Sequence, residues 1–325
     1  MNALSLFTAL GVGLILSTSA ASASTLSLDG SLPVFQVSGS YALSSPGLSD
    51  ERRFSEFGNG SSSNGQVAID DGFDIQWRGN LATGELGLSS TETANTALPA
   101  GELDTSLGSI RLYDFLTFNN PNGISDVTFD LALEGTQTLL GENGIVQFGS
   151  RVSLYDVTDV TDPLEIGFVA DATNVQAVSV TNEAFANLVG SFDVTQGSFT
   201  GLEDSGINLD TLRTFVDEVD GQGQQSVVNA SSEETFMVQN DRTYMLAYSM
   251  SFLNELGPNT AVTHDFLGTS TLRITDLGGA VLHSASGVFL AETDVAAVPL
   301  PAGLPMLVMA LAGLGFIRRT RTEIV

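Results

Sequence analysis

Three evenly spaced aspartates are the most suggestive group of chemically active residues in this chain. Asp156, Asp159 and Asp162 lie within the segment Asp-Val-Thr-Asp-Val-Thr-Asp-Pro. Calcium binds six to eight hard oxygen ligands, and closely spaced carboxylates in extracellular loops can supply them. The segment has no glycine at the turn and no glutamate at the distance found in helix–loop–helix calcium sites. A strand followed by a polar turn is therefore the preferred interpretation, and calcium binding is a minor hypothesis.

Paired carboxylates could cleave glycosidic bonds if two of them stood about 5–9.5 Å apart across a cleft. The chain has 38 acidic residues, so close pairs arise by chance. The pairs considered are Asp70 with Asp71, Asp126 with Asp130, and Glu233 with Glu234. Adjacent acids on a strand point to opposite faces, so these spacings do not favour catalysis.

Nucleophilic and metal-dependent catalysis lack the residues that they need. There is no cysteine, no Gly-x-Ser-x-Gly elbow, and just two histidines, which excludes thiol chemistry and a three-histidine zinc centre. His264 adjoins Asp265, but sequence neighbours do not have the geometry of a catalytic triad. We interpret His264 as a loop or strand-edge residue and His283 as part of a strand. The sequence thus predicts no catalytic residue, no cofactor and no metal ligand.

The single tryptophan could serve as a platform for a sugar ring. Trp77 alternates with Phe73 and Ile75, which is the period of a strand with one buried face. A lone tryptophan in such a run is more simply a core residue.

The charge balance excludes several classes of partner. All 11 cationic residues are arginine, against 38 acids, which gives a formal net charge of −27. A chain this acidic repels nucleic acid phosphates and anionic lipid headgroups. Because 42% of the residues are hydrophobic and 19 are phenylalanine, the chain can still bury a core, so we expect a folded protein without disulfides.

The elements that must position these residues are short runs with strand periodicity. The alternating runs are Val127–Leu133, Ile145–Phe148, Arg151–Tyr155, Thr235–Val238, Tyr244–Met250 and Ser270–Ile274. Turn residues such as Pro121-Asn122-Gly123 and Gly257-Pro258-Asn259 separate several of them. This pattern predicts an all-β fold, an antiparallel β-sandwich or jelly roll.

Two segments depart from this pattern. Residues 208–219 place Leu209, Leu212, Phe215, Val216 and Val219 on one helical face, which predicts a short surface helix or a long loop. Residues 48–66 are rich in glycine and serine and are predicted to form a loop or a disordered segment. Residues 24–297 then form one exported domain, or two sub-domains that divide near residues 194–204.

The N-terminus has the pattern of a secretory signal. The stretch from Ala3 to Leu16 is apolar apart from two hydroxyl residues, and the small residues Ala21 and Ala23 follow it. The sequence predicts a signal peptide over residues 1–23, cleaved by signal peptidase after Ala23.

The C-terminus has the pattern of a membrane segment with a basic stop. Residues 298–317 could span a bilayer, although prolines restrict the helix to Pro305–Ile317. The membrane stop is formed by Arg318, Arg319 and Arg321, which the positive-inside rule keeps in the cytoplasm. A plain transmembrane anchor remains the alternative interpretation of residues 298–325.

The motif before this segment is specific. It consists of Val298, Pro299, Leu300, Pro301 and Ala302. Followed by a Leu/Ala/Gly-rich stretch and arginines, it resembles the VPLPA variant of the PEP-CTERM sorting domains. The resemblance implies an exported bacterial protein, processed by an exosortase-type membrane protease close to Pro301–Ala302, often in strains that make exopolysaccharide.

Together these features predict a non-enzymatic exported protein with a structural or adhesive role near exopolysaccharide. It would pass through an intermediate anchored in the inner membrane and reach the cell surface or the medium. A carbohydrate-binding module or matrix lectin is the first alternative, and a secreted glycan hydrolase is the second.

Overall fold

The computed structural model describes residues 26–27, 33–43, 51–60, 62–70, 72–94, 98, 103–141, 144–169, 175–196, 213–216 and 224–290. They all belong to one compact unit, Met1–Ala291. The second unit, Glu292–Val325, lies outside the described residues.

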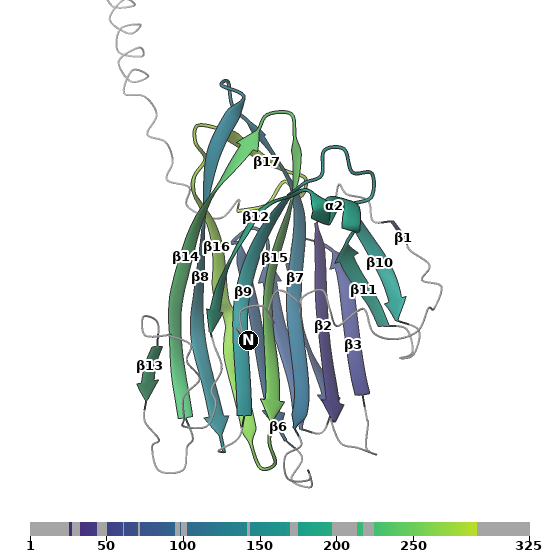
Figure 1. Ribbon diagram of the computed structural model, residues 1–325, viewed down its shortest axis with the longest axis vertical. Helices are drawn as coiled ribbons and strands as arrows, with labels where there is room; N and C mark the ends of the chain where they lie inside the picture. Colours follow the sequence, from purple (N-terminus) through teal and green to yellow (C-terminus); the bar gives the residue numbers. More distant parts are fainter. Residues whose placement is uncertain are drawn as a thin grey trace, which may run out of the picture. The chain divides into compact units, whose positions relative to one another are not determined.

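The described residues form two large antiparallel sheets and a small one (Figure 1). The front sheet contains β2 (Val34–Leu43), β3 (Glu51–Asn59), β7 (Asp104–Asn119), β9 (Gly144–Asp156), β12 (Leu188–Gln196), β15 (Thr243–Leu256) and β17 (Val281–Ser284). Its order is β12-β9-β15-β7-β2-β3, and β17 also pairs with β7.

The back sheet contains β4 (Ser62–Asp70), β5 (Phe73–Asn80), β6 (Glu85–Thr93), β8 (Ile124–Leu140), β13 (Arg213–Val216), β14 (Gln224–Gln239) and β16 (Ala261–Asp276). Its order is β13-β14-β8-β16-β6-β5-β4. The small sheet consists of β1 (Leu26–Ser27), β10 (Leu164–Val169) and β11 (Val175–Val180), and the helix α2 (Asn182–Ala186) follows it.

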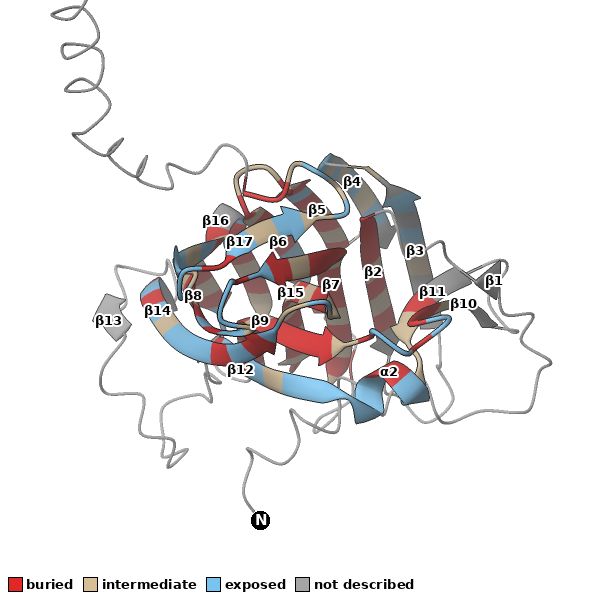
Figure 2. Cartoon of the chain, turned by 90° about the horizontal axis from the view of Figure 1, so that it is seen from above, coloured by how far each residue is buried: buried red, intermediate tan, exposed pale blue. Residues whose placement is uncertain are grey.

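The two large sheets pack face to face as a β-sandwich, with buried residues on the facing sides of both (Figure 2). Strand periodicity produces this arrangement, because every second side chain points inward. Across the gap, the rings of Phe148 in β9 and Phe266 in β16 stack with centroids 3.8 Å apart. Within the front sheet, Gly108 leaves room for the ring of Phe252, which lies where a Cβ atom would be.

A second hydrophobic cluster covers part of the outer face of the front sheet. It joins Tyr113, Phe115, Tyr155 and Met245 to residues of the small sheet and α2, among them Leu164, Val178 and Ala184. The side-chain amide of Gln36 in β2 exchanges two hydrogen bonds with the backbone of Val178, at 2.9 and 3.2 Å, in the orientation that satisfies both of its atoms. The small sheet is thereby fixed over one side of the front sheet.

The predicted all-β antiparallel sandwich is confirmed, and every alternating run named above lies within a strand. The predicted loop over residues 48–66 is wrong at residues 51–59 and 62–66, where β3 and β4 pair with β2 and β5. Gly65 occurs within β4 because a Cβ atom there would collide with the indole of Trp77.

The predicted helix over residues 208–219 is also wrong at its centre. Arg213–Val216 forms β13, which pairs with β14 in register from Arg213–Val228 to Val216–Gln225. The apolar residues in this segment satisfy helical spacing, but strand pairing prevails over it. The helix among the described residues is α2, where Thr181 accepts a hydrogen bond from the Ala184 amide as the N-cap residue.

Candidate functional site

The outer face of the front sheet carries a row of cationic and polar side chains. In register, Arg151 of β9 and Arg111 of β7 lie on either side of Ser249 in β15. The row continues to Asp193 of β12 at one end and Gln36 of β2 at the other. Because two strand spacings separate the arginines, their Cβ atoms are about 10 Å apart.

The neighbouring row consists of hydroxyl side chains. Ser251 of β15 pairs with Ser109 of β7, which pairs with Ser38 of β2, and Ser38 pairs with Ser55 of β3. The Oγ atoms of Ser38 and Ser109 are hydrogen-bonded at 2.9 Å. We call these two rows the Arg–Ser face, which comprises Gln36, Ser38, Ser55, Ser109, Arg111, Arg151, Ser249 and Ser251.

The positive charge of this face is only partly compensated. Arg151 forms an ion pair with Asp193 at 3.6 Å, and both side chains are 42% exposed, so the pair is weak. The Nε atom of Arg151 is buried without a hydrogen-bond partner in the described part of the chain. Arg111 forms no ion pair with any described residue.

Tyr155 lies close to both arginines. Burial raises the pKa of its hydroxyl, while the hydrogen bond with Ser153 and the charges of Arg151 and Arg111 act in the opposite direction. The two guanidinium groups therefore act on the same region of the sheet surface. Chemically, the Arg–Ser face offers two cations beside hydroxyl groups, which suits recognition of an acid group attached to a polar molecule. The amide of Gln36 is buried and bonded to Val178, so it belongs to the support of this face.

A second polar cluster is sealed between the two sheets. Asn254 of β15 donates from Nδ2 to the Glu92 carboxylate of β6 at 2.9 Å, and its Oδ1 accepts from His264 Nε2 at 2.7 Å. The other ring nitrogen of His264 lies 3.3 Å from Nε2 of Gln137. Ser106 also donates to Glu92. Glu92, Asn254 and His264 are fully buried.

Burial controls the ionisation of this cluster. It raises the pKa of Glu92 to about 7, against the lowering effect of the hydrogen bonds from Ser106 and Asn254, and nearby Asp104 raises it further. Burial lowers the pKa of His264 to about 3. A carboxylic acid and a neutral imidazole held by the same amide could transfer protons, but neither group reaches solvent.

The structure corrects the interpretation of the histidines. His264 is a fully buried residue of the central strand β16, not a loop or strand-edge residue, because its ring hydrogen-bonds with two inward-facing amide side chains. Asp265, the next residue, is exposed on the opposite face, so the two form no catalytic pair. The prediction that His283 belongs to a strand is confirmed by β17.

The aspartate segment forms a polar turn after a strand, as the preferred interpretation predicted. Strand β9 ends at Asp156, whose carboxylate accepts from Thr158 and from Arg242, the latter at 2.5 Å. Val157 and Val160 are buried, whereas Asp159 is exposed. Among the described residues, no three histidine or acidic side chains gather closely enough to hold a metal ion.

The structure does not support a catalytic role for the predicted acid pairs whose residues it describes. Asp126 and Asp130 lie on one face of β8, four residues apart, which corresponds to about 13 Å and exceeds the span that glycosidases use. Glu233 pairs directly with Asp130 across the open outer face of the back sheet. Glu234 instead lines a shallow groove, and Asp71 lies outside the described residues.

The core interpretation of Trp77 is confirmed. The side chain is 5% exposed, stacks on Phe54 with ring centroids 5.9 Å apart, and donates from Nε1 to Ser63 at 3.2 Å. Its ring faces are therefore not available as a sugar platform.

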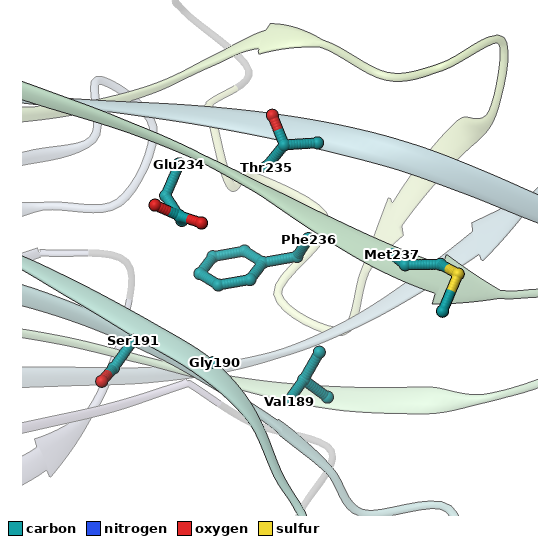
Figure 3. A pocket seen from close by; sticks show the side chains of 7 residues that line it. All are labelled: Val189, Gly190, Ser191, Glu234, Thr235, Phe236 and Met237. Atoms are coloured by element: carbon teal, nitrogen blue, oxygen red, sulfur yellow. The ribbon is translucent and has the colours of Figure 1, made fainter.

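Two shallow grooves lie where β12 meets neighbouring elements. One, of about 280 Å³, lies between β12 and β14, where the Phe236 ring points toward Gly190 and Val189 (Figure 3). The other, of about 290 Å³, is lined by Asp156, Asp159, Asn187, Leu188 and Arg242. In the second groove the hydrogen bond with Asp156 raises the pKa of Arg242, and burial of Asp156 is outweighed by the hydrogen bonds that lower the pKa of its carboxyl group.

The predicted signals at the two ends lie outside the described residues. These are the cleavage residues Ala21 and Ala23, the sorting motif Val298, Pro299, Leu300, Pro301 and Ala302, and the membrane stop Arg318, Arg319 and Arg321. Within the part of the chain that the structure describes, no helix has the length and apolar character needed to cross a bilayer.

Sequence reasoning missed both polar clusters. The sequence does contain a pattern that indicates the Arg–Ser face. Ser109, Arg111 and Tyr113 occupy alternate positions of one strand run, and Arg151, Ser153 and Tyr155 occupy alternate positions of another. These residues share the outward faces of their strands, but their proximity depends on β15 lying between β7 and β9.

Comparison with protein family models, curated proteins and solved structures found no match to this chain.

Proposed function

We propose that this chain is an exported, non-enzymatic protein of the bacterial cell envelope or extracellular matrix, with a structural or adhesive role. The observation that carries the proposal is the Arg–Ser face, a surface of fixed cations and hydroxyl groups on rigid paired strands. It offers several hydrogen-bond donors and no nucleophile paired with a base. Such a surface suits attachment to a polar polymer rather than its chemical conversion.

The arrangement of the strongest chemical groups supports the same proposal. Glu92 has the residue type and, at about 7, the pKa of a general acid, yet it is fully buried with His264 and both are bonded to Asn254. Groups that never meet a substrate serve the sandwich itself, by fixing the position of one sheet over the other.

The predicted signals at the two ends of the chain indicate where the protein acts. In this proposal, residues 1–23 direct export and are removed after Ala23, and residues 298–325 hold the protein briefly in the inner membrane. The resemblance to VPLPA-type sorting domains adds an exosortase-type protease that releases the protein near Pro301–Ala302. The protein then acts at the cell surface or in the medium, near exopolysaccharide.

Intact mass spectrometry of the protein from its native host tests this proposal. The membrane, surface and medium fractions are compared for the position of the C-terminus. We expect the surface or medium fraction to contain protein that begins at Ser24 and ends near Pro301–Ala302. Protein that keeps Val325 and stays in the membrane fraction would make residues 298–325 a plain anchor, and protein that keeps Met1 in the cytoplasm would refute export.

A further inference from the structure

Arg111 lies on the outer face of the front sheet and forms no ion pair with a described residue. It shares a row with a second arginine, and the described residue that ion-pairs in this row, Asp193, lies beyond Arg151. Two like charges on one face repel each other, and an anion placed between them removes that cost. The residue between them in register is Ser249, which is half-buried and has a small side chain with a hydroxyl group.

We propose that the Arg–Ser face binds an acidic saccharide, whose carboxylate lies over Ser249 between the guanidinium groups of Arg111 and Arg151. This inference rests on the proposed function and names its ligand class. A guanidinium group presents parallel N–H donors that match the two oxygens of a carboxylate. The side chain of Arg151 is 42% exposed, so part of its guanidinium group is accessible to a ligand from solvent.

The neighbouring row explains why the ligand is a saccharide. Ser251 and Ser38 are half-buried and place hydroxyl groups two strand spacings apart, about 10 Å, beside the arginine row, while Ser109 between them is buried and hydrogen-bonded to Ser38. Sugar hydroxyl groups both donate and accept, as these serine side chains do. A protein partner would instead need an apolar contact centre. Every side chain in the arginine row from β12 to β2 is polar, and the serine row contains Gly149 but no large apolar side chain.

The net charge of the whole chain narrows the class of acidic saccharide that we expect as the ligand. With a net charge of −27, the protein repels a dense polyanion such as nucleic acid or a heavily sulfated glycan. Two arginines at one place can still hold an isolated acid group, because attraction is strongest at short range and salt screens the distant charges. The expected ligand is a glycan that carries occasional uronic acid residues.

Isothermal titration calorimetry with the protein from its native host tests the inference. The probe is tetragalacturonate, and its carboxyl-reduced neutral form is the control saccharide. We expect the acidic form to bind at least about tenfold more tightly, which corresponds to about 1.4 kcal/mol. Equal binding of the two forms, or no binding of either, would overturn the inference.

Matched variants locate the site. R111Q and R151Q should each weaken binding of tetragalacturonate about tenfold or more, because each removes a charge-assisted hydrogen-bond donor. R273Q removes one exposed arginine from β16 of the back sheet and should bind as the wild type does. An equal loss in all three variants would mean attraction by net charge alone and would refute a site on the Arg–Ser face.

Folding controls and localisation keep the outcomes separate. The thermal melt of each variant, followed by circular dichroism, identifies a loss of binding that comes from unfolding, and R111K and R151K then replace the glutamine variants. These lysine variants keep the charge but lose the paired donors, so unchanged binding would contradict the geometry. If the protein is exported and processed but does not bind tetragalacturonate, this inference is overturned and the proposed function stands. If the protein stays in the cytoplasm, the proposed function is refuted, and the titration still decides this inference.

Discussion

The buried cluster of Glu92, Asn254 and His264 makes a prediction about stability that depends on two opposed titrations. Burial raises the pKa of Glu92 from 4.5 to about 7, so this group stabilises the fold fully below pH 4.5 and loses its contribution as the pH rises toward 7. Burial lowers the pKa of His264 from 6.5 to about 3, so that group stabilises the fold fully above pH 6.5 and loses its contribution as the pH falls toward 3.

Between pH 4.5 and 6.5 the two effects cancel. Each titration changes the free energy of unfolding by about 1.4 kcal/mol per pH unit, with a negative slope for Glu92 and a positive slope for His264. A variant that lacks one of the two groups should show the pH dependence of unfolding that the other group causes. Relative to the wild type, E92Q should gain stability with rising pH at about 1.4 kcal/mol per unit, and H264Q should lose it at about the same rate.

Urea unfolding at several pH values measures these slopes. The fluorescence of Trp77 reports unfolding, because this single tryptophan is buried against Phe54 in the folded state. Subtraction of the wild-type curve removes the background from the other acids, and E233Q, at an exposed position of β14, is the control for loss of a carboxyl group. Slopes of the same sign in E92Q and H264Q would refute the assignment of opposed titrations to this cluster.

Two further predictions concern packing and the aspartate segment. G108A should lower the free energy of unfolding by about 1–3 kcal/mol, because a methyl group there meets the Phe252 ring, whereas G58A, which meets nothing within 4 Å, should leave urea unfolding within about 0.5 kcal/mol of the wild type. D156N should cost less than about 1 kcal/mol, because its ion pair with Arg242 is partly exposed. That cost should vanish in acid. Burial of Asp156 is outweighed by hydrogen bonds from Thr158 and Arg242, which lower the pKa of its carboxyl group. The ion pair therefore stabilises the fold above pH 3.8 and is lost as the pH falls below that value. Equal melting temperatures in millimolar calcium and in chelator are expected, and a rise with calcium would restore the metal hypothesis.

The fold class could be predicted because the strongest strands obey strict alternation. In β15 the inward residues Tyr248, Met250 and Phe252 are all buried, and the residues between them are small or polar. Strands β3 and β4 were missed because glycine and serine in their sequences also indicate turns. Their pairing depends on neighbours distant in the chain, which local propensity does not contain.

The candidate sites could be predicted far less well, since register decides them. Glu92 lies in the run Ser-Ser-Thr-Glu-Thr, which looks like the solvated face of a strand, yet it faces the core. Arg111 and Arg151 are 40 positions apart in sequence and meet because β15, a third distant segment, pairs with both of their strands. No pattern within a single run specifies such a juxtaposition.

The position of β16 has a mechanical consequence. This last long strand before the C-terminal segment is not at an edge, because it is hydrogen-bonded to β8 on one side and to β6 on the other. A tether attached beyond Leu290 would first load β17, which pairs with β7 alone, and would then reach β16, which is held from both sides. Force directed along the strand loads these bonds in shear, so that they share the load and fail together, whereas an edge strand would peel away one bond at a time. Once β17 has detached, β16 is thus the strand that would resist tension applied through the C-terminal end.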